Sequence, residues 1–281
     1  MNKKGKLYLV ATPIGNLDDI TIRAIKVLQN VDLIAAEDTR HSLKLLNHLE
    51  ISKPLISYHR HNEENKTEVL INKLLNGENI ALITDAGTPA ISDPGEEVVK
   101  QAIEKEIEII PIPGACALIN ALICSGMNTR EFAFYGFLPL NKKLRKNKFE
   151  EIKKENKTII LYEAPHKINQ TLKDILQEVG DVNIVLAREL TKIHEEFIRG
   201  KISEIIEKYT DLKGEMIIVL EGNKFDNSTD KLTELLNNMS IEEHYNYYKK
   251  QNLEKKEIVK KMAKDRNVNK NEIYMKVINF N

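Results

Sequence analysis

The sequence predicts an α/β fold: two unlike α/β domains followed by a small helical extension. Two observations support this fold class. Short hydrophobic runs typical of strands alternate with amphipathic helical segments up to about residue 220. Beyond that point the apolar residues keep helical spacing and no strand pattern occurs. We expect the domains at residues 1–118 and 119–224, and the extension at 225–281.

The first domain is expected to hold a mainly parallel sheet. Its strands are predicted at 7–10, 33–36, 80–83 and 108–112, with helices at 20–29, 63–75 and 96–106. Strands that alternate with helices indicate βαβ units. The nearly continuous apolar character of these strands is typical of a sheet covered on both faces.

The second domain is expected to hold a mixed sheet. Its strands are predicted at 132–137, 158–162, 184–188, 195–198 and 216–220, with helices at 168–178 and 202–209. The segment between 184–188 and 195–198 leaves little room for a helix, so these strands need not be parallel.

The extension is predicted to form short helices compatible with a helix-turn-helix. One helical face carries Ile258, Met262 and Ala263. Asn269, with Glu272 three positions on, is a candidate N-cap for a final helix that carries Ile273 and Val277.

Charge and composition exclude several classes of protein. No apolar run approaches the ~18 residues of a membrane span, and the N-terminus lacks a signal-peptide pattern. Cys116 and Cys124 are too few and wrongly spaced for a disulfide framework or a thiolate metal site. The histidines form no metal-binding motif, so we expect no metal. These features predict a soluble, cytoplasmic protein.

The charge is balanced in total but uneven along the chain. The 42 basic and 42 acidic side chains give a net charge of zero, which argues against a nucleic-acid partner. However, residues 142–157 and 249–276 are strongly basic, and a phosphate-rich partner responds to the local field within ~8 Å at physiological salt. The run at 142–157 is equally well interpreted as a solvated helix face.

Two polar loops follow the first two predicted strands. In loop 11–19, Gly15 allows a ligand to approach the backbone, although the segment matches no dinucleotide or Walker motif. The plainer interpretation is a strand-to-helix turn capped by Asp18 or Asp19. In loop 37–41, Glu37 or Asp38 could act as a base and Arg40 could hold a phosphate. A capped helix start with an internal ion pair explains this loop equally well.

Two further loops are rich in small residues. Loop 84–95 is costly to order unless it touches a ligand, and Asp85 could accept a hydrogen bond from an amino group. Asp93 is expected to be the N-cap of the next helix, with Pro94 at its first position. In loop 111–117 the small side chains would let a flat ligand lie on the backbone, and Cys116 is expected to be an apolar filler.

Six motifs in order give the chain a family resemblance. They are LYLVATPIGNL at 7–17, AEDTR at 36–40, DAGTP with DPG at 85–95, PGA at 113–115, FYGFLP at 134–139 and YEAPH at 162–166. Over essentially the whole chain this pattern resembles the ribosomal RNA small subunit methyltransferase I family, within the tetrapyrrole-methylase superfamily. Thr84-Asp85-Ala86-Gly87 departs from the Gly-Asp-Pro turn of tetrapyrrole methylases, which favours the ribosomal RNA branch.

The resemblance implies a tetrapyrrole-methylase-like fold, usually a homodimer, with S-adenosylmethionine in the cleft between two α/β domains. It implies 2′-O-methylation of a cytidine ribose in the decoding region of small-subunit (16S) ribosomal RNA. The expected partner is this RNA in the assembled small subunit. The implied cofactor contacts are Pro13, Ile14, Gly15, Asp85, Gly87, Thr88, Ala115, Cys116, Tyr162, Gly214 and Met216.

A ribose hydroxyl is a poor nucleophile, so a general base is useful. The candidate bases are Glu37, Asp38, Glu163 and Glu189, and the candidate phosphate or oxyanion partners are Arg40 and Arg188. Two alternatives stay open: a methyltransferase of a tetrapyrrole, and a nucleic-acid-binding protein that senses S-adenosylmethionine without catalysis.

Overall fold

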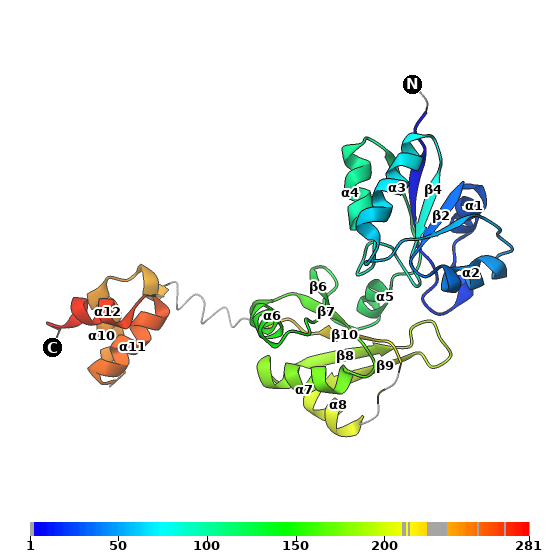
Figure 1. Cartoon of the computed structure of the whole chain (residues 1–281). Helices are drawn as coiled ribbons and strands as arrows, with labels where there is room; N and C mark the ends of the chain where they lie inside the picture. The colour runs from blue at the N-terminus through cyan, green and yellow to red at the C-terminus, as the bar shows by residue number, and fades with distance from the viewer. Residues whose placement is uncertain are drawn as a thin grey trace. The chain divides into compact units, whose positions relative to one another are not determined.

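The chain forms two compact units, Met1–Gly222 and Asn223–Asn281. The computed structural model describes residues 3–209, 212, 214–223, 235–251, 253–266 and 268–280 (Figure 1). Residue 225, the predicted start of the extension, lies outside the described residues. None of the helices in these ranges is long and apolar enough to cross a membrane.

The first unit begins with a five-stranded parallel sheet in the order β3-β2-β4-β1-β5. Its strands are β1 (Lys6–Val10), β2 (Leu33–Ala36), β3 (Leu55–Ser57), β4 (Ile80–Ile83) and β5 (Glu108–Ile112). The four predicted strands and their parallel pairing are confirmed. The short strand β3 is an addition, because three half-buried residues after Pro54 carry too little pattern to stand out.

Helices cover both faces of the first sheet, as its buried strands require. They are α1 (Ile22–Asn30), α2 (Thr39–His48), α3 (Glu63–Leu75) and α4 (Glu96–Glu104), with the 3-10 turn η1 (Leu17–Asp19) before α1. Leu70 and Val98 of α3 and α4 pack in one core, and Leu28 and Leu46 of α1 and α2 pack in the other. Figure 1 shows the two helix pairs on opposite sides of the sheet.

Two predicted helix caps are wrong. The N-cap of α1 is Thr21, whose hydroxyl accepts the N–H of Ala24 at 3.1 Å, so neither Asp18 nor Asp19 serves. The N-cap of α4 is Gly95, which has a φ of 144° and no side chain, so Asp93 is left free of that role and Pro94 lies outside the helix.

The second sheet is mixed, as predicted, with the order β6-β7-β10-β8-β9. Its strands are β6 (Phe132–Phe137), β7 (Thr158–Glu163), β8 (Asn183–Arg188), β9 (Glu196–Lys201) and β10 (Met216–Leu220). β6 and β7 are parallel, whereas β10 runs antiparallel to both β7 and β8, and β9 antiparallel to β8. The carboxyl ends of β6, β7 and β8 therefore share an edge with the start of β10.

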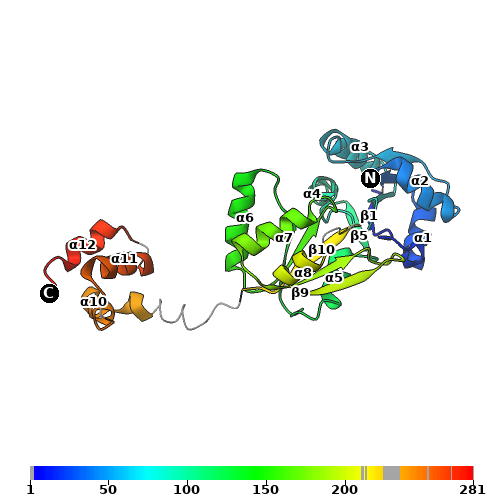
Figure 2. The same ribbon diagram turned by 90° about the horizontal axis from the view of Figure 1, so that it is seen from below.

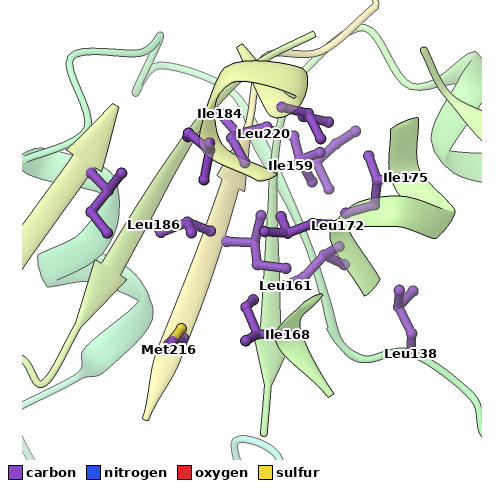
Figure 3. Close-up of a cluster of buried hydrophobic side chains, with 14 of the residues drawn as sticks. Leu138, Ile159, Leu161, Ile168, Leu172, Ile175, Ile184, Leu186, Met216 and Leu220 are labelled. Carbon is purple, nitrogen blue, oxygen red and sulfur yellow. The ribbon is translucent and has the colours of Figure 1, made fainter. Parts of the chain in front are cut away.

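The second sheet also has two covered faces. Helices α6 (Lys142–Lys154), α7 (Ile168–Glu178) and α8 (Ile202–Lys208) enclose the larger core, which is drawn in Figure 3 around Leu161, Leu172 and Leu186. On the other face, α5 (Ala117–Ile123) buries Leu118 and Leu122 against Val219. Because α5 directly follows β5, the chain leaving the first sheet packs on the second.

The second unit is a helical bundle with its own core. Its described helices include α10 (Ile241–Lys249), α11 (Lys255–Asp265) and α12 (Lys270–Val277). The predicted apolar face is buried in that core, as are Ile273 and Val277. Asn269 caps α12 by accepting the N–H of Asn271 at 3.0 Å, which confirms the predicted cap.

Candidate functional site

A cavity of about 360 Å³ lies in the first unit where the strand ends of its two sheets meet. The first sheet contributes Ile14, Ala86, Gly87, Thr88, Ile91, Ser92, Asp93, Cys116 and Ala117. The second contributes Phe137, Tyr162, Glu163, Ala164, Pro165, Ala187, Leu190, Glu215, Met216 and Ile217. Ligands of open α/β sheets bind beyond the carboxyl ends of strands, and the volume is that of a small-molecule site.

The loops after β1 and β4 are joined to each other at this edge. Thr12 and Gly87 exchange two backbone hydrogen bonds, of 2.8 and 3.1 Å, and the Thr12 hydroxyl donates to the carbonyl of Thr84 at 3.1 Å. Gly87 has a φ of 86°, and a Cβ there would lie 3.2 Å from Cγ2 of Ile14. Glycine at residue 87 therefore takes this path without the strain that another residue would meet.

The loop after β5 lies against the same pair. The Thr88 hydroxyl donates to the carbonyl of Ala115 at 3.2 Å. A Cβ on Gly114 would lie 2.9 Å from Cβ of Ala11, so the small residues of this loop permit close packing of neighbouring loops. The small residues of this loop thus have a structural role, and their predicted role beside a ligand stays a prediction.

Six of the eleven predicted cofactor contacts line the cavity, and five do not. The lining residues are Ile14, Gly87, Thr88, Cys116, Tyr162 and Met216. Of the others, Pro13 and Asp85 border a small hollow of about 40 Å³. Ala115 lies behind Thr88, as described above.

Because Gly15 and Gly214 have no side chain, the backbone at each lies close to the loop after β8. A Cβ on Gly15 would lie 2.6 Å from Cγ of Lys192, and one on Gly214 would lie 2.4 Å from Oε1 of Glu189. The N–H of Asn16 also donates to the Thr191 hydroxyl at 3.0 Å. The contacts of Gly15 and Asn16 join the first loop of the first sheet to the second sheet, and that of Gly214 lies within the second sheet's own loops.

Aromatic rings form part of the second wall. Tyr162 contacts Phe134 and Phe137 edge-to-face, with ring centroids 4.9 and 5.6 Å apart. Burial raises the pKa of Tyr162 to about 12, so its hydroxyl stays protonated at neutral pH. This wall offers apolar area and ring faces, which attract a bound cation.

Among the candidate bases, Glu163 lines the cavity and is buried. Its Oε2 accepts the Thr171 hydroxyl at 2.6 Å and its Oε1 accepts the N–H of Ala164 at 2.8 Å. Both oxygens are therefore already hydrogen-bonded.

Three other candidates follow β2 and are not among the residues that line the cavity. Glu37 accepts the Thr84 hydroxyl at 2.7 Å. Asp38 is the N-cap of α2 and forms an ion pair with Arg40 at 2.9 Å, as the plainer interpretation of this loop predicts. The hydrogen bond from Arg40 holds the pKa of Asp38 at about 2.

The remaining two candidates follow β8. Nη1 of Arg188 donates to Glu196 at 3.2 Å. Oε1 of Glu189 accepts the N–H of Glu215 at 2.9 Å and Nζ of Lys192 at 3.2 Å. Neither lines the cavity, and the contacts of Glu189 hold the turn that precedes β10.

Asp93 lines the cavity although the sequence analysis assigned it to a helix cap. Burial, followed by the negative charge of Glu37, raises its pKa to about 6. One signal in the sequence could have revealed this: Gly95 separates the Asp-Pro pair from the apolar helical pattern and takes the cap position itself.

The chain matches the family model of tetrapyrrole (corrin/porphyrin) methylases over residues 6–206. It is 47% identical to the ribosomal RNA small subunit methyltransferase I of Halalkalibacterium halodurans over 273 residues, which cover 96% of this chain and 94% of that relative. It is also 47% identical to the protein of that name from Bacillus subtilis, over 96% of this chain and 93% of the relative.

Among solved structures, a diphthine synthase shares the fold with a TM-score of 0.59 at 13% identity, over 77% of this chain and 90% of the other. The sequence identities cover nearly the full length of both proteins. Most of the cavity lining lies within the part that the family model matches, and Glu215, Met216 and Ile217 follow it. This chain therefore belongs to the ribosomal RNA small subunit methyltransferase I family, within the tetrapyrrole methylases.

Proposed function

We propose that this protein transfers a methyl group from S-adenosylmethionine to the ribose 2′-hydroxyl of a cytidine in the decoding region of small-subunit ribosomal RNA. The observation that carries the proposal is the cavity between the two sheets, formed by the family's motif segments. The names of its relatives support methylation of ribosomal RNA. We propose that the protein works in the cytoplasm, as a homodimer, on the assembled small subunit.

The cavity has the properties that S-adenosylmethionine requires. Its volume suits a cofactor of that size, and Gly87 and Ala117 leave backbone accessible on one side. When bound, S-adenosylmethionine supplies a methyl group made electrophilic by its sulfonium charge. The rings of Phe137 and Tyr162 and the carboxylates of the cavity provide a favourable surface for a cation.

The protein's main contribution is positioning. Hydrogen bonds join the loops at Thr12, Gly87 and Ala115 on one wall, and Asn16 is bonded to Thr191 of the other. Holding two reactants in line can remove roughly 7–11 kcal/mol from a barrier. A base that takes the hydroxyl proton adds ~10²–10⁴ in rate.

Basic surfaces support a phosphate-rich substrate. A groove of about 510 Å³ between α6 and α7 is lined by Lys142, Lys146 and Lys167, and its Arg145 is ion-paired with Asp174 at 2.8 Å. Glu178 also lines it. Figure 2 shows these two helices side by side. In the second unit, α11 exposes Lys256, Lys260, Lys261 and Lys264. Such lysines favour RNA through its backbone, with an affinity that falls as salt rises.

The experiment uses small subunits from a strain that lacks the gene, with S-adenosylmethionine labelled in the methyl group. We expect label in the ribosomal RNA, in a ribose of a single cytidine, and none in a porphyrinoid offered in parallel. Labelling of the porphyrinoid in place of RNA would favour the tetrapyrrole methyltransferase. Tight cofactor binding with no label in any RNA would favour the sensor.

A truncated chain separates the roles of the two units. Every residue that lines the cavity lies in the first unit, so deletion of residues 226–281 should leave cofactor affinity unchanged by calorimetry. RNA affinity should weaken, and its dependence on salt should become shallower, because lysines of α11 are lost. A tetrapyrrole methyltransferase would have no need of those lysines, and its turnover would survive the deletion.

A further inference from the structure

We propose that Asp93 is the general base of the methyl transfer, the group that removes the proton from the attacking hydroxyl. The inference rests on the proposed function, since it names the residue that activates a ribose hydroxyl in that reaction. It stands on the position of Asp93 in the cavity and on the conformation of its loop.

The loop that carries Asp93 is held in a strained conformation. Ala90 and Ser92 have φ angles of 66° and 65°, which non-glycine residues rarely adopt. The loop is fixed by a hydrogen bond from the N–H of Ala90 to the carbonyl of Pro94 at 3.3 Å and by the Arg60 guanidinium, which donates to the carbonyl of Ser92. Strain of this kind persists where the surroundings impose it, and it clusters at functional sites.

Asp93 does not cap helix α4, the role that the sequence suggests for it. Gly95 is the N-cap of α4, and its N–H donates to Oε1 of Glu63 at 2.9 Å. The Asp93 carboxylate is thus not needed to start the helix. It lines the cavity instead, at the carboxyl edge of β4 where a ligand would lie.

The other acidic groups that line the cavity are less suited to take a proton. Both carboxylate oxygens of Glu163 accept hydrogen bonds, from Thr171 and from the backbone of Ala164. Glu215 forms an ion pair with Lys192 at 3.0 Å. Tyr162, with its pKa raised to about 12, does not ionise at neutral pH.

The surroundings of Asp93 suit a base. The charged groups that act on its carboxylate are Glu37, Asp85 and Arg60, and the Thr84 hydroxyl acts through a hydrogen bond. Tyr162, which also lines the cavity, is the other titratable group that interacts with it. Burial and the charges of Glu37 and Asp85 raise its pKa to about 6, against the opposing effects of Thr84 and Arg60. A carboxylate with this pKa is ionised at pH 7 to 8 yet accepts a proton more readily than an ordinary aspartate.

The step balances with the proton on Asp93. A lone pair of the 2′-oxygen forms the new bond to the methyl carbon, and the carbon–sulfur bond breaks with its electron pair left on sulfur, which becomes a neutral thioether. The hydroxyl proton passes to the carboxylate of Asp93. The positive sulfonium and the negative carboxylate are both neutralised, so no further reactant is needed.

The test compares Asp93→Asn, Asp93→Glu and Glu96→Gln, the last being a matched control at an exposed carboxylate of the first turn of α4. Single-turnover rates on small subunits are measured from pH 5 to 9, and cofactor affinity is measured by calorimetry. We expect Asp93→Asn to lower the rate by roughly 10²–10⁴-fold and to abolish the inflection near pH 6. Asp93→Glu should restore part of the rate, Glu96→Gln should behave as wild type, and all variants should bind cofactor within about threefold of wild type.

A second readout does not depend on activity. Carboxyl carbon NMR of labelled wild-type protein should show an aspartate that titrates near pH 6 and is missing from Asp93→Asn. A rate within about threefold of wild type in Asp93→Asn, an unchanged inflection, or loss of cofactor binding in that variant would overturn the assignment. If wild type and Asp93→Asn label RNA alike, only the role of Asp93 fails. If wild type labels none, the proposed function fails with it.

Discussion

Oδ1 of Asp85 accepts a hydrogen bond from the backbone N–H of Asp38 at 3.1 Å. The two residues follow β4 and β2, which are neighbours in the first sheet. The carboxylate therefore joins two loops at the edge of the sheet that borders the cavity, where the sequence alone suggested that it faces a ligand.

Replacement of Asp85 by alanine should lower stability. The N–H of Asp38 loses a charged acceptor, a change that costs about 1–2 kcal/mol for a partly buried group. Urea unfolding of Asp85→Ala against Asp85→Asn checks this, because asparagine keeps an oxygen acceptor at the same place. Equal stability of alanine variant and wild type would show that the bond contributes nothing.

Replacement of Gly87 by alanine should reduce cofactor binding as well as stability. A non-glycine residue at a φ of 86° costs about 1 kcal/mol or more, and its Cβ would press on Ile14. We expect cofactor affinity, measured by calorimetry, to fall by about tenfold or more.

Gly126→Ala is the matched control for this substitution. Gly126 has a similar φ of 78°, but a Cβ there has no atom within 4 Å and the residue lies away from the cavity lining. It should show the backbone cost alone, with cofactor affinity unchanged. Similar losses of affinity in the two variants would contradict the crowding at Ile14.

Replacement of Thr171 by valine should destabilise the first unit. The Thr171 hydroxyl donates to Oε2 of buried Glu163 at 2.6 Å and accepts from Nη2 of Arg145 at 2.8 Å. Valine has similar volume but removes the hydroxyl that donates to Oε2 of the buried carboxylate, at a cost of about 2–3 kcal/mol. Thr171→Ser keeps the hydroxyl and should lie within about 1 kcal/mol of wild type in denaturant unfolding. A serine variant as unstable as the valine variant would assign the effect to packing.

The second unit should lose stability in mild acid. His244 is fully buried, with its Nδ1 accepting from Nε of Arg266 at 2.9 Å and its Nε2 facing Asp265 at 3.3 Å. Burial, and then the charge of Arg266, lower the pKa of His244 below 6.5. The buried ring is more difficult to protonate in the folded than in the unfolded chain. His244 therefore costs the fold nothing above pH 6.5, and the free energy of unfolding decreases as the pH falls below that value.

Amide hydrogen exchange of α10 to α12 at pH 7.5 and 5.5, corrected for the intrinsic rates, measures this effect. Wild type should open more readily at pH 5.5, and His244→Gln should show little dependence on pH. If the same dependence persists in the glutamine variant, another group is responsible.

The long and strongly patterned elements could be predicted from the sequence. The four apolar strands of the first sheet and the core face of α11 are confirmed. Burial on both faces gives a strand a continuous apolar run, and burial on one stripe gives a helix a regular apolar period. Strand β3 was missed because a strand of three half-buried residues has no period to detect. The predicted N-cap of α4, Asp93, is wrong. Gly95 follows the Asp93-Pro94 pair and is itself the N-cap.

The sequence by itself determined the fold class, the polar loops at the strand ends and the family, since these depend on local pattern and on motif order. Only the tertiary structure decided which of those polar residues face the cavity. Asp85 accepts a hydrogen bond from the backbone of Asp38, and Glu163 accepts one from Thr171. Asp93 lines the cavity. The physical reason is that a carboxylate's role depends on which donors reach it. The backbone of Asp38 is 47 positions from Asp85, and the Thr171 hydroxyl is 8 positions from Glu163, so the folded chain decides whether they meet.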